Sequence, residues 1–177
     1  MSEKNMKFLI KIVFVIILLS GCSFDNEEYT NNIYLIPEGF EGSITVFYDV
    51  PNEARLKKEG KYTVIPVNAL GLDELKNTEI YVYGASFTST PDMNMGIIND
   101  KYYYVDKEGK RTAINEQCVS ISGGGNGNFT GVSGKTIYFD HIQVTRSNCG
   151  ENFRSEGKEI YYSQQKEVMD FWMNYFD

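Results

Sequence analysis

Apolar and polar residues alternate over short stretches along most of the chain. In the stretch SITVFYDV, an extended backbone places Ile44, Val46 and Tyr48 on one face and Thr45 and Phe47 on the other. Other short stretches are rich in β-branched and aromatic residues and are separated by Gly, Pro, Asn or Asp. The pattern predicts strands at residues 31–37, 43–50, 61–66, 79–84, 101–105, 110–114, 117–122 and 135–145.

The clearest turn lies within KYYYVDKEGKRTAI, residues 101–114. Asp106 suits the start of a type I turn and Gly109 suits a left-handed backbone, so we expect a hairpin here. Two polar stretches are read differently. NEARLKKEG, residues 52–60, is expected to be a charged loop, and VNALGLDELKN, residues 67–77, is expected to hold a short helical turn.

One amphipathic helix is predicted at the end of the chain, over residues 163–176. Ser163 suits its N-cap. Its apolar residues recur at spacings of three and four: Val168, Phe171, Trp172, Tyr175 and Phe176. We expect this helix to cover one end or face of the sheets, and docking to a partner is the alternative.

These elements define the expected fold class, which is mainly β. Short strands in close succession, without amphipathic helices between them, predict an antiparallel β-sandwich of about eight strands with one C-terminal α-helix. The length of 177 residues suits one domain, and the 13 Tyr and 11 Phe favour strands. We place this single domain at residues 33–177.

Residues 1–21 have the features of an export signal. Lys4 and Lys7 precede an apolar run, and the uninterrupted part of that run, residues 12–19, is too short to span a bilayer comfortably. A basic start followed by a short apolar segment is typical of a signal peptide.

The signal segment ends in Leu-Ser-Gly-Cys, which resembles the bacterial lipobox. The resemblance implies that Cys22 carries acyl chains, such as palmitate, and becomes the mature N-terminus. Two acyl chains suffice for stable membrane anchoring. Residues 22–32 then form a polar tether on the extracytoplasmic face of the cell membrane. A plain secretory signal and an N-terminal membrane helix are the alternatives.

The charge of the chain narrows the class of partner. The sequence carries a net charge of −7, and removal of residues 1–21, which carry a net +2, leaves −9. Nucleic-acid binding needs a basic face, and docking on anionic lipid needs basic residues. We therefore expect no nucleic-acid partner, and we expect the acyl chains alone to hold the protein at the membrane.

Cys118 and Cys149 are the two cysteines left after Cys22 is assigned to the anchor. An even pair in an exported protein predicts a disulfide. The bond would close a loop of about 30 residues and contribute roughly 3–4 kcal/mol. Two free thiols are the alternative.

The tripeptide GKT at residues 134–136 resembles the end of a phosphate-binding loop. The first glycine of that motif would fall at position 129, which is Phe129, and a strand rather than a helix is expected to follow. We therefore expect no nucleotide. SGGGNGNFTGVSG, residues 122–134, is expected to be a surface loop. It offers three weak ligand-contact candidates: Gly125, Asn126 and Asn128.

His141 is the single histidine. It falls within a predicted strand with Asp140 on the opposite face, so we expect a sheet-surface residue rather than a catalytic base. One histidine and two paired cysteines do not form a zinc site. Asp92 and Asn94 match two positions of a calcium loop, but Gly96 comes one place early, which leaves only a looser cation site as an alternative. We expect no metal, no cofactor and no catalytic residue, and hence no enzyme.

Three consecutive tyrosines, Tyr102, Tyr103 and Tyr104, stand in one predicted strand. Core and cross-strand packing explains most tyrosines of a sheet. An exposed row would instead stack on sugars or contact a protein partner. We therefore keep these three residues as ligand-contact candidates.

The segments YLIPEGFEGSITVFYDVP, KKEGKYTVIPVNALG and KYYYVDKEGKRTAI resemble a family of uncharacterised bacterial lipoproteins and secreted proteins with YLIPxG, IPxN and YYVDxxGKR segments. The resemblance covers residues 33–176. IPVNALG departs from the usual IPENG, and the loop at 85–99 is longer than expected. The resemblance implies no activity and no catalytic residue. The strand pattern also resembles prealbumin-like or immunoglobulin-like sandwiches, which is an analogy of fold alone.

Together these observations predict a membrane-anchored extracytoplasmic lipoprotein. We expect a non-catalytic cell-envelope binding module for a protein or a glycan. Two alternatives stay open. An envelope hydrolase would need two converging carboxylates about 5–10 Å apart. An immunity or inhibitor protein would need a compact acidic surface for a basic target.

Overall fold

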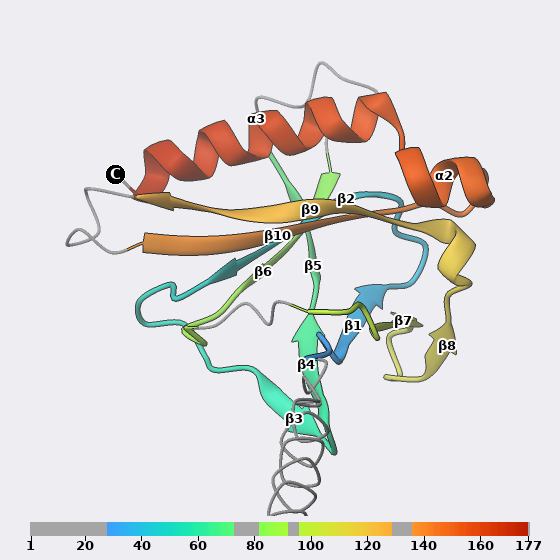
Figure 1. Ribbon diagram of the computed structural model, residues 1–177, viewed down its shortest axis with the longest axis horizontal. Coiled ribbons are helices and arrows are strands. Elements are labelled where there is room, and N and C mark those ends of the chain that lie inside the picture. Colours follow the sequence, from blue (N-terminus) through green and yellow to red (C-terminus); the bar gives the residue numbers. More distant parts are fainter. Residues whose placement is uncertain (1–27, 73–81, 92–95, 129–135, 177) are drawn as a thin grey trace, which may run out of the picture.

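Two five-stranded sheets face each other in the computed structural model, which describes residues 28–72, 82–91, 96–128 and 136–176 (Figure 1). The first sheet contains, in spatial order, β3 (Lys57–Glu59), β4 (Tyr62–Pro66), β1 (Asn32–Pro37), β7 (Lys101–Val105) and β8 (Arg111–Ala113). The second contains β5 (Asn68–Gly71), β6 (Val82–Phe87), β2 (Gly42–Tyr48), β10 (Thr136–Val144) and β9 (Val119–Asn128).

Three helices complete the described part of the chain. The short 3-10 helix η2 (Glu116–Cys118) connects the two sheets, and α2 (Glu151–Glu156) and α3 (Glu159–Phe176) follow β10. The predicted class, a mainly β sandwich with a C-terminal helix, is confirmed. Within the described ranges, no helix combines the length and the apolar character needed to cross a bilayer.

The strands pair in both directions. Of the eight pairs among the described strands, five are antiparallel, as expected of a mainly antiparallel sandwich, and three are parallel. β1 runs parallel to β4 and to β7, and β2 runs parallel to β6 and antiparallel to β10. The reason is the path of the chain. Four antiparallel hairpins, β3–β4, β5–β6, β7–β8 and β9–β10, alternate between the first and the second sheet. Each sheet therefore has a central strand, β1 or β2, between two hairpins whose direction local sequence does not set.

The two faces of β2 are buried against different partners. Ile44, Val46 and Tyr48 belong to the core between the sheets, and Phe47 packs with Met169 of α3 on the outer face of the second sheet. The alternation predicted for this strand is therefore confirmed. Both faces are buried because α3 covers the one that would otherwise meet water.

Helix α3 is fixed to the second sheet by a buried amide. The side-chain oxygen of Gln164 accepts hydrogen bonds from the backbone N–H and the hydroxyl of Ser43, at 3.0 and 2.8 Å, and its nitrogen donates to the carbonyl of Val82 at 2.8 Å. The helix begins at Glu159, so Ser163 lies inside it and the predicted N-cap is wrong. The predicted covering of a sheet face is confirmed (Figure 1).

One other local prediction is wrong, and one is confirmed. The expected charged loop contains β3, and Asn68–Gly71 forms β5. Both are short strands that a neighbouring strand pairs at a sheet edge. The rest of the stretch expected to hold a helical turn, from residue 73 to 77, lies outside the described residues. The hairpin of β7 and β8 is confirmed, since Asp106 caps its turn and Gly109 has a φ of 83°.

The glycine-rich residues 122–128 belong to β9, so the surface loop predicted there is wrong. They pair in register with β10, and a bulge at Ser122 and Gly123, whose φ is 91°, absorbs a shift between Ile142 and His141. Pairing in a sheet needs only backbone N–H and C=O groups, and glycine has both. The long, regular β10 can therefore pair with this glycine-rich segment as with any other. The rest of the predicted loop, residues 129–134, lies outside the described residues.

Candidate ligand-binding cavity

A cavity of about 270 Å³ opens between the two sheets beside β7 and β9. It is formed where four separate segments meet: the residues before β7, β7 itself, the turn from η2 into β9, and α2. Its lining comprises Ile98, Asn99, Asp100, Tyr102, Glu116, Val119, Ile121 and Arg154. Polar and charged groups therefore share the wall with aliphatic side chains, as is common in ligand sites.

Tyr102 supplies the cavity with a buried polar group. Its side chain is 5% exposed, and its ring stacks on that of Tyr34 with the centroids 5.3 Å apart. The hydroxyl has no hydrogen-bond partner among the described residues. Burial, and then the carboxylates of Asp100, Asp140 and Glu116, raise the pKa of Tyr102, so the hydroxyl stays protonated. An unpartnered buried group of this kind lowers the free energy of unfolding by about 1–3 kcal/mol. This cost points to a ligand that supplies the missing hydrogen bond.

Asp100 forms the acidic wall beside Tyr102. One oxygen accepts hydrogen bonds from the hydroxyl of Thr30 at 2.6 Å and the backbone N–H of Asn32 at 2.7 Å. The other oxygen is 3.5 Å from the amide nitrogen of Asn32. Burial raises the pKa of Asp100, and these hydrogen bonds oppose that rise. The carboxyl thus holds the starts of β1 and β7 together and keeps one oxygen able to accept a further donor.

The mouth of the cavity is charged and partly apolar. Glu116 and Arg154 form a loose ion pair at 3.6 Å, and both side chains are exposed. An exposed pair of this kind contributes little stability, so each group is available to a ligand. Ile98 and Ile121, which are 52% and 40% exposed, flank the charged groups.

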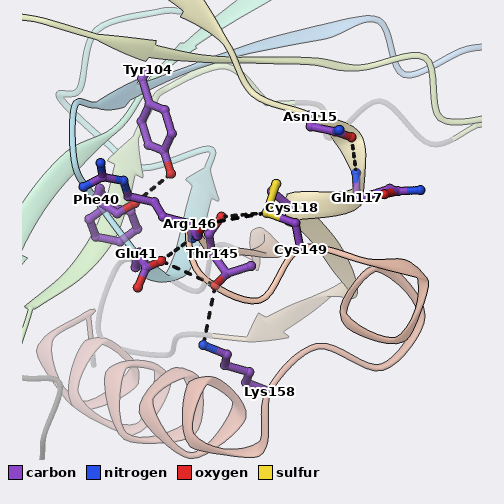
Figure 2. The surroundings of a disulfide bond; sticks show 10 residues. All are labelled: Phe40, Glu41, Tyr104, Asn115, Gln117, Cys118, Thr145, Arg146, Cys149 and Lys158. Atoms are coloured by element: carbon purple, nitrogen blue, oxygen red, sulfur yellow. Dashed lines mark hydrogen bonds between the residues drawn. A yellow bond between two sulfur atoms is a disulfide. The ribbon is translucent and has the colours of Figure 1, made fainter.

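A disulfide between Cys118 and Cys149 supports two walls of the cavity, and the predicted pairing is confirmed (Figure 2). The backbone N–H of Thr145 donates to the carbonyl of Cys118 at 3.0 Å, which continues the contact between β9 and β10. Cys118 ends the helix that carries Glu116, and Cys149 precedes the helix that carries Arg154. The bond therefore fixes the distance between the two sides of the mouth.

A second acidic residue lies deeper between the sheets. The hydroxyl of Tyr34 donates to Asp140 at 3.2 Å, and burial raises the pKa of Asp140 to about 6. The adjacent His141 faces the other side of the sheet, as expected, but it is 5% exposed rather than on the surface. Its Nδ1 is 2.9 Å from the hydroxyl oxygen of Thr45, and burial lowers its pKa to about 4. The surface prediction is wrong because α3 covers this face.

The predicted tyrosine row is not an exposed surface. Tyr102 is in the core, and Tyr103 and Tyr104 are half-buried. The hydroxyl of Tyr104 donates to the carbonyl of Phe40 at 3.0 Å (Figure 2). Of the three candidates, only Tyr102 lines the cavity.

The remaining candidates lie elsewhere. Gly125 is part of β9, where an added Cβ would lie 3.0 Å from the ring of Phe139, and Asn126 and Asn128 follow in the same strand. Gly125 does not line the cavity. Cys22 lies outside the described residues, as do both candidate calcium ligands, Asp92 and Asn94.

Sequence reasoning missed Asp100, Glu116 and Arg154. None belongs to a motif, and each lies on a different segment, so they converge only when the two sheets stack. The one available signal was Asp100 itself, an acid directly before an apolar strand. In the described part of the chain, no group of three or more His, Cys, Asp and Glu side chains is placed to hold a metal ion.

A second hollow of about 310 Å³ lies between β4 and β6. Its lining, Ala54, Arg55, Leu56, Lys57, Val64, Pro66 and Phe87, is mostly apolar. None of the buried polar atoms that lack a partner is among these residues. The cavity at Tyr102 is therefore the better-formed candidate site.

The fold and the cavity define a two-sheet β-sandwich protein with a ligand-sized opening between its sheets. Residues 28–153 match a family of unknown function (DUF6843), and the chain belongs to that family. It is also similar to a crystal structure named "Putative Lipoprotein from Bacillus anthracis", with a TM-score of 0.67 and 32% identity over 83% of this chain and 94% of that chain. No curated protein matches the sequence. The resemblance to an uncharacterised family is confirmed; the YLIPxG, IPxN and YYVDxxGKR signature and the immunoglobulin-like or prealbumin-like analogy stay predictions.

Proposed function

We propose that this protein is a lipid-anchored, extracytoplasmic binding module whose cavity at Tyr102 binds an alkylammonium group. The observation that carries the proposal is the buried, unpartnered hydroxyl of Tyr102 inside an acidic wall. No step of this role requires catalysis. The similarity to a protein named as a lipoprotein supports the anchoring, and the cavity supports the binding.

The charges around the hydroxyl favour a cation. Asp100, Asp140 and Glu116 act on Tyr102 with negative potential, and Arg154 opposes them. A primary ammonium group has three donors and no acceptor. It would donate to the hydroxyl oxygen of Tyr102 and to the Asp100 oxygen that has only the long hydrogen bond from Asn32. Its alkyl stem would lie between Ile98 and Ile121. A charge-assisted hydrogen bond is stronger than a neutral one, especially away from water.

A glycan receives less support. Sugar binding commonly uses aromatic rings whose faces are open for stacking. The face of Tyr102 is stacked on Tyr34, and Tyr103 and Tyr104 are half-buried. An amine, or a protein that presents one, therefore fits the site better than a sugar.

Chemical-shift mapping tests the binding role. The full ¹⁵N-labelled chain in nonionic detergent micelles is titrated with n-butylammonium, and with n-butanol as a neutral compound of similar shape. We expect n-butylammonium to shift amides of Asp100, Tyr102, Val119 and Ile121, and Glu116→Gln to weaken the effect. Glu108→Gln, a surface change in the hairpin turn, is the control. Equal shifts with n-butanol, or no shifts at the cavity, would overturn the proposal.

The anchoring role has its own test. Cys22→Ser removes the thiol to which the acyl chains would be attached. We expect the variant to leave the membrane fraction or to accumulate as an unprocessed precursor, with a mass that lacks the lipid. Cys118→Ser is the control, since it should lose the disulfide and keep the anchor. Unchanged mass and membrane retention in Cys22→Ser would contradict a lipid on this residue.

A further inference from the structure

We propose that β9 accepts an extended segment of a partner protein as an added strand, and that a lysine of this segment inserts into the Tyr102 cavity. The inference rests on the proposed function, because the lysine supplies the ammonium group. It adds the kind of partner, a polypeptide in extended conformation, and the surface that holds its backbone.

The first observation is the position of β9. It is the outermost strand of the second sheet and spans Val119–Asn128, and among the described strands it pairs only with β10. An edge strand presents a row of backbone N–H and C=O groups that a further strand can use. Figure 1 shows β9 running alongside β10, below α3.

The second observation is the composition of this edge. Natural proteins block exposed edges with lysine, proline, bulges or short strands. The sequence VSISGGGNGN contains no charged residue and no proline. The bulge at Ser122 and Gly123 is one protective feature, and α2 lies close to part of the strand. Beyond the bulge, Gly124 and Gly125 carry no side chain that would keep another backbone away.

The third observation connects the edge to the cavity. Val119 and Ile121 belong to β9 and also line the cavity at Tyr102. A strand paired with β9 would therefore lie beside the cavity mouth, and its side chains would alternate between the inner and outer faces of the sheet. A lysine on the inner face near Ile121 is long enough to reach Asp100, because its four-carbon stem is flexible.

Charge supports the choice of partner. The acids Asp100 and Glu116 border the cavity, and the whole chain carries a net charge of −7. An acidic protein attracts basic segments and repels acidic ones. The exposed Ile98 and Ile121 offer apolar contact for the stem of the inserted lysine. The partner is thus a segment with β-forming residues around a central lysine.

Peptide binding to the full chain in nonionic micelles tests the inference. One library of seven-residue peptides has lysine at the centre and Val, Thr, Ser or Tyr at the other positions, and a matched library has norleucine at the centre. We expect the best lysine peptide to bind at least about tenfold more tightly than its norleucine counterpart, because a charge-assisted hydrogen bond is lost. We also expect it to slow hydrogen exchange at β9 amides and not at the edge strands β3 and β5.

N-methylation of the best peptide examines the backbone contacts. In an added strand, alternate N–H groups face β9, so methylation of one alternate set should abolish binding and methylation of the other set should not. Equal tolerance of both sets, or binding without protection of β9, would overturn the inference.

Titration with n-butylammonium separates the two proposals. If the cavity binds the amine but no lysine peptide binds better than its norleucine match, strand addition fails and the cavity proposal stands. If neither the amine nor the peptides bind, both proposals fail together.

Discussion

The rings of Tyr34 and Tyr102 are stacked with their centroids 5.3 Å apart, yet only one of the two hydroxyls is paired. Tyr34 donates to Asp140 at 3.2 Å, whereas Tyr102 has no partner among the described residues. Two similar side chains in one core thus have different energetic roles. The first satisfies the half-buried Asp140, and the second has a buried, unpartnered hydroxyl on a side chain that lines the cavity.

Because of this difference, we expect replacement by phenylalanine to affect the free energy of unfolding differently at the two tyrosines. Tyr34→Phe removes a donor from the half-buried Asp140 and should lower the free energy of unfolding by about 1–3 kcal/mol. Tyr102→Phe removes a buried hydroxyl that has no partner among the described residues, so in the absence of ligand the free energy of unfolding should stay unchanged or rise by up to about 1–3 kcal/mol. Urea unfolding of both variants measures this. A loss of stability in Tyr102→Phe that matched the loss in Tyr34→Phe would contradict the assignment.

The pKa shifts of Asp140 and His141 predict opposing effects of pH on stability. Burial raises the pKa of Asp140 from 3.8 to about 6, so its contribution to folding is present below about pH 4 and is lost as the pH rises through about 6. Burial lowers the pKa of His141 from 6.5 to about 4, so its contribution is present above pH 6.5 and is lost as the pH falls through about 4. Each contribution is on the order of 3 kcal/mol, so between about pH 4 and 6.5 the two largely offset each other.

Single substitutions should reveal each contribution. We expect Asp140→Asn to make the free energy of unfolding fall more steeply than wild type as the pH is lowered from 6.5 to 4. His141→Gln should have the reverse effect, with stability rising over the same range relative to wild type. Urea unfolding across this range provides the measurement, and the slope is compared because His141→Gln also loses its contact with Thr45. Parallel curves for all three proteins would show that neither group titrates as described.

The Cys118–Cys149 bond predicts a redox-dependent stability. The cysteines are 31 residues apart, and the chain-entropy model gives a contribution of about 3–4 kcal/mol for such a loop. We expect the double change Cys118→Ser and Cys149→Ser to lower the free energy of unfolding by this amount and to weaken amine binding, because the sides of the mouth are no longer joined. Reductant should destabilise wild type similarly and leave the double variant unchanged. A double variant as stable as the oxidised wild type would contradict this role.

The packing around Gly84 leaves no room for a side chain at this position in the core. A Cβ added there would lie 2.6 Å from Cγ1 of Ile44 and 3.0 Å from Cγ1 of Val67. Gly84→Ala should therefore lower the free energy of unfolding by about 1–3 kcal/mol, which thermal or urea unfolding measures. Gly71→Ala in the edge strand β5 is the matched control, because no heavy atom lies within 4 Å of the added Cβ. Equal stability of the two variants would argue against this packing.

Local patterns were enough to predict the elements whose partners are close in sequence. The alternation in β2, the Asp106–Gly109 turn and the periodicity of the last helix each depend on neighbouring residues, and all three are confirmed. The disulfide followed from the number of cysteines and the expected compartment. These signals depend on neighbouring residues or on composition, so they can be interpreted without knowledge of the fold.

Properties that depend on the arrangement of the sheets were not predictable in this way. The parallel pairing of β1 with β4 and β7 arises because hairpins alternate between sheets. The burial of His141 follows from the covering of this sheet face by α3, which comes later in the chain (Figure 1). The glycine run looks like a loop until β10 supplies its partner. Asp100, Tyr102 and Arg154 come together only in the folded protein, so no sequence motif predicts the cavity.

The affinity of the Tyr102→Phe variant for n-butylammonium decides whether the cavity binds cations as proposed. The dissociation constant is measured by calorimetry for wild type, Tyr102→Phe and the control Tyr104→Phe, whose hydroxyl contacts Phe40 outside the cavity. We predict that Tyr102→Phe weakens binding by about tenfold, which corresponds to the loss of one hydrogen bond, and that Tyr104→Phe binds as wild type does. Equal affinity in wild type and Tyr102→Phe, or no measurable binding to wild type, would contradict the proposed role of this cavity.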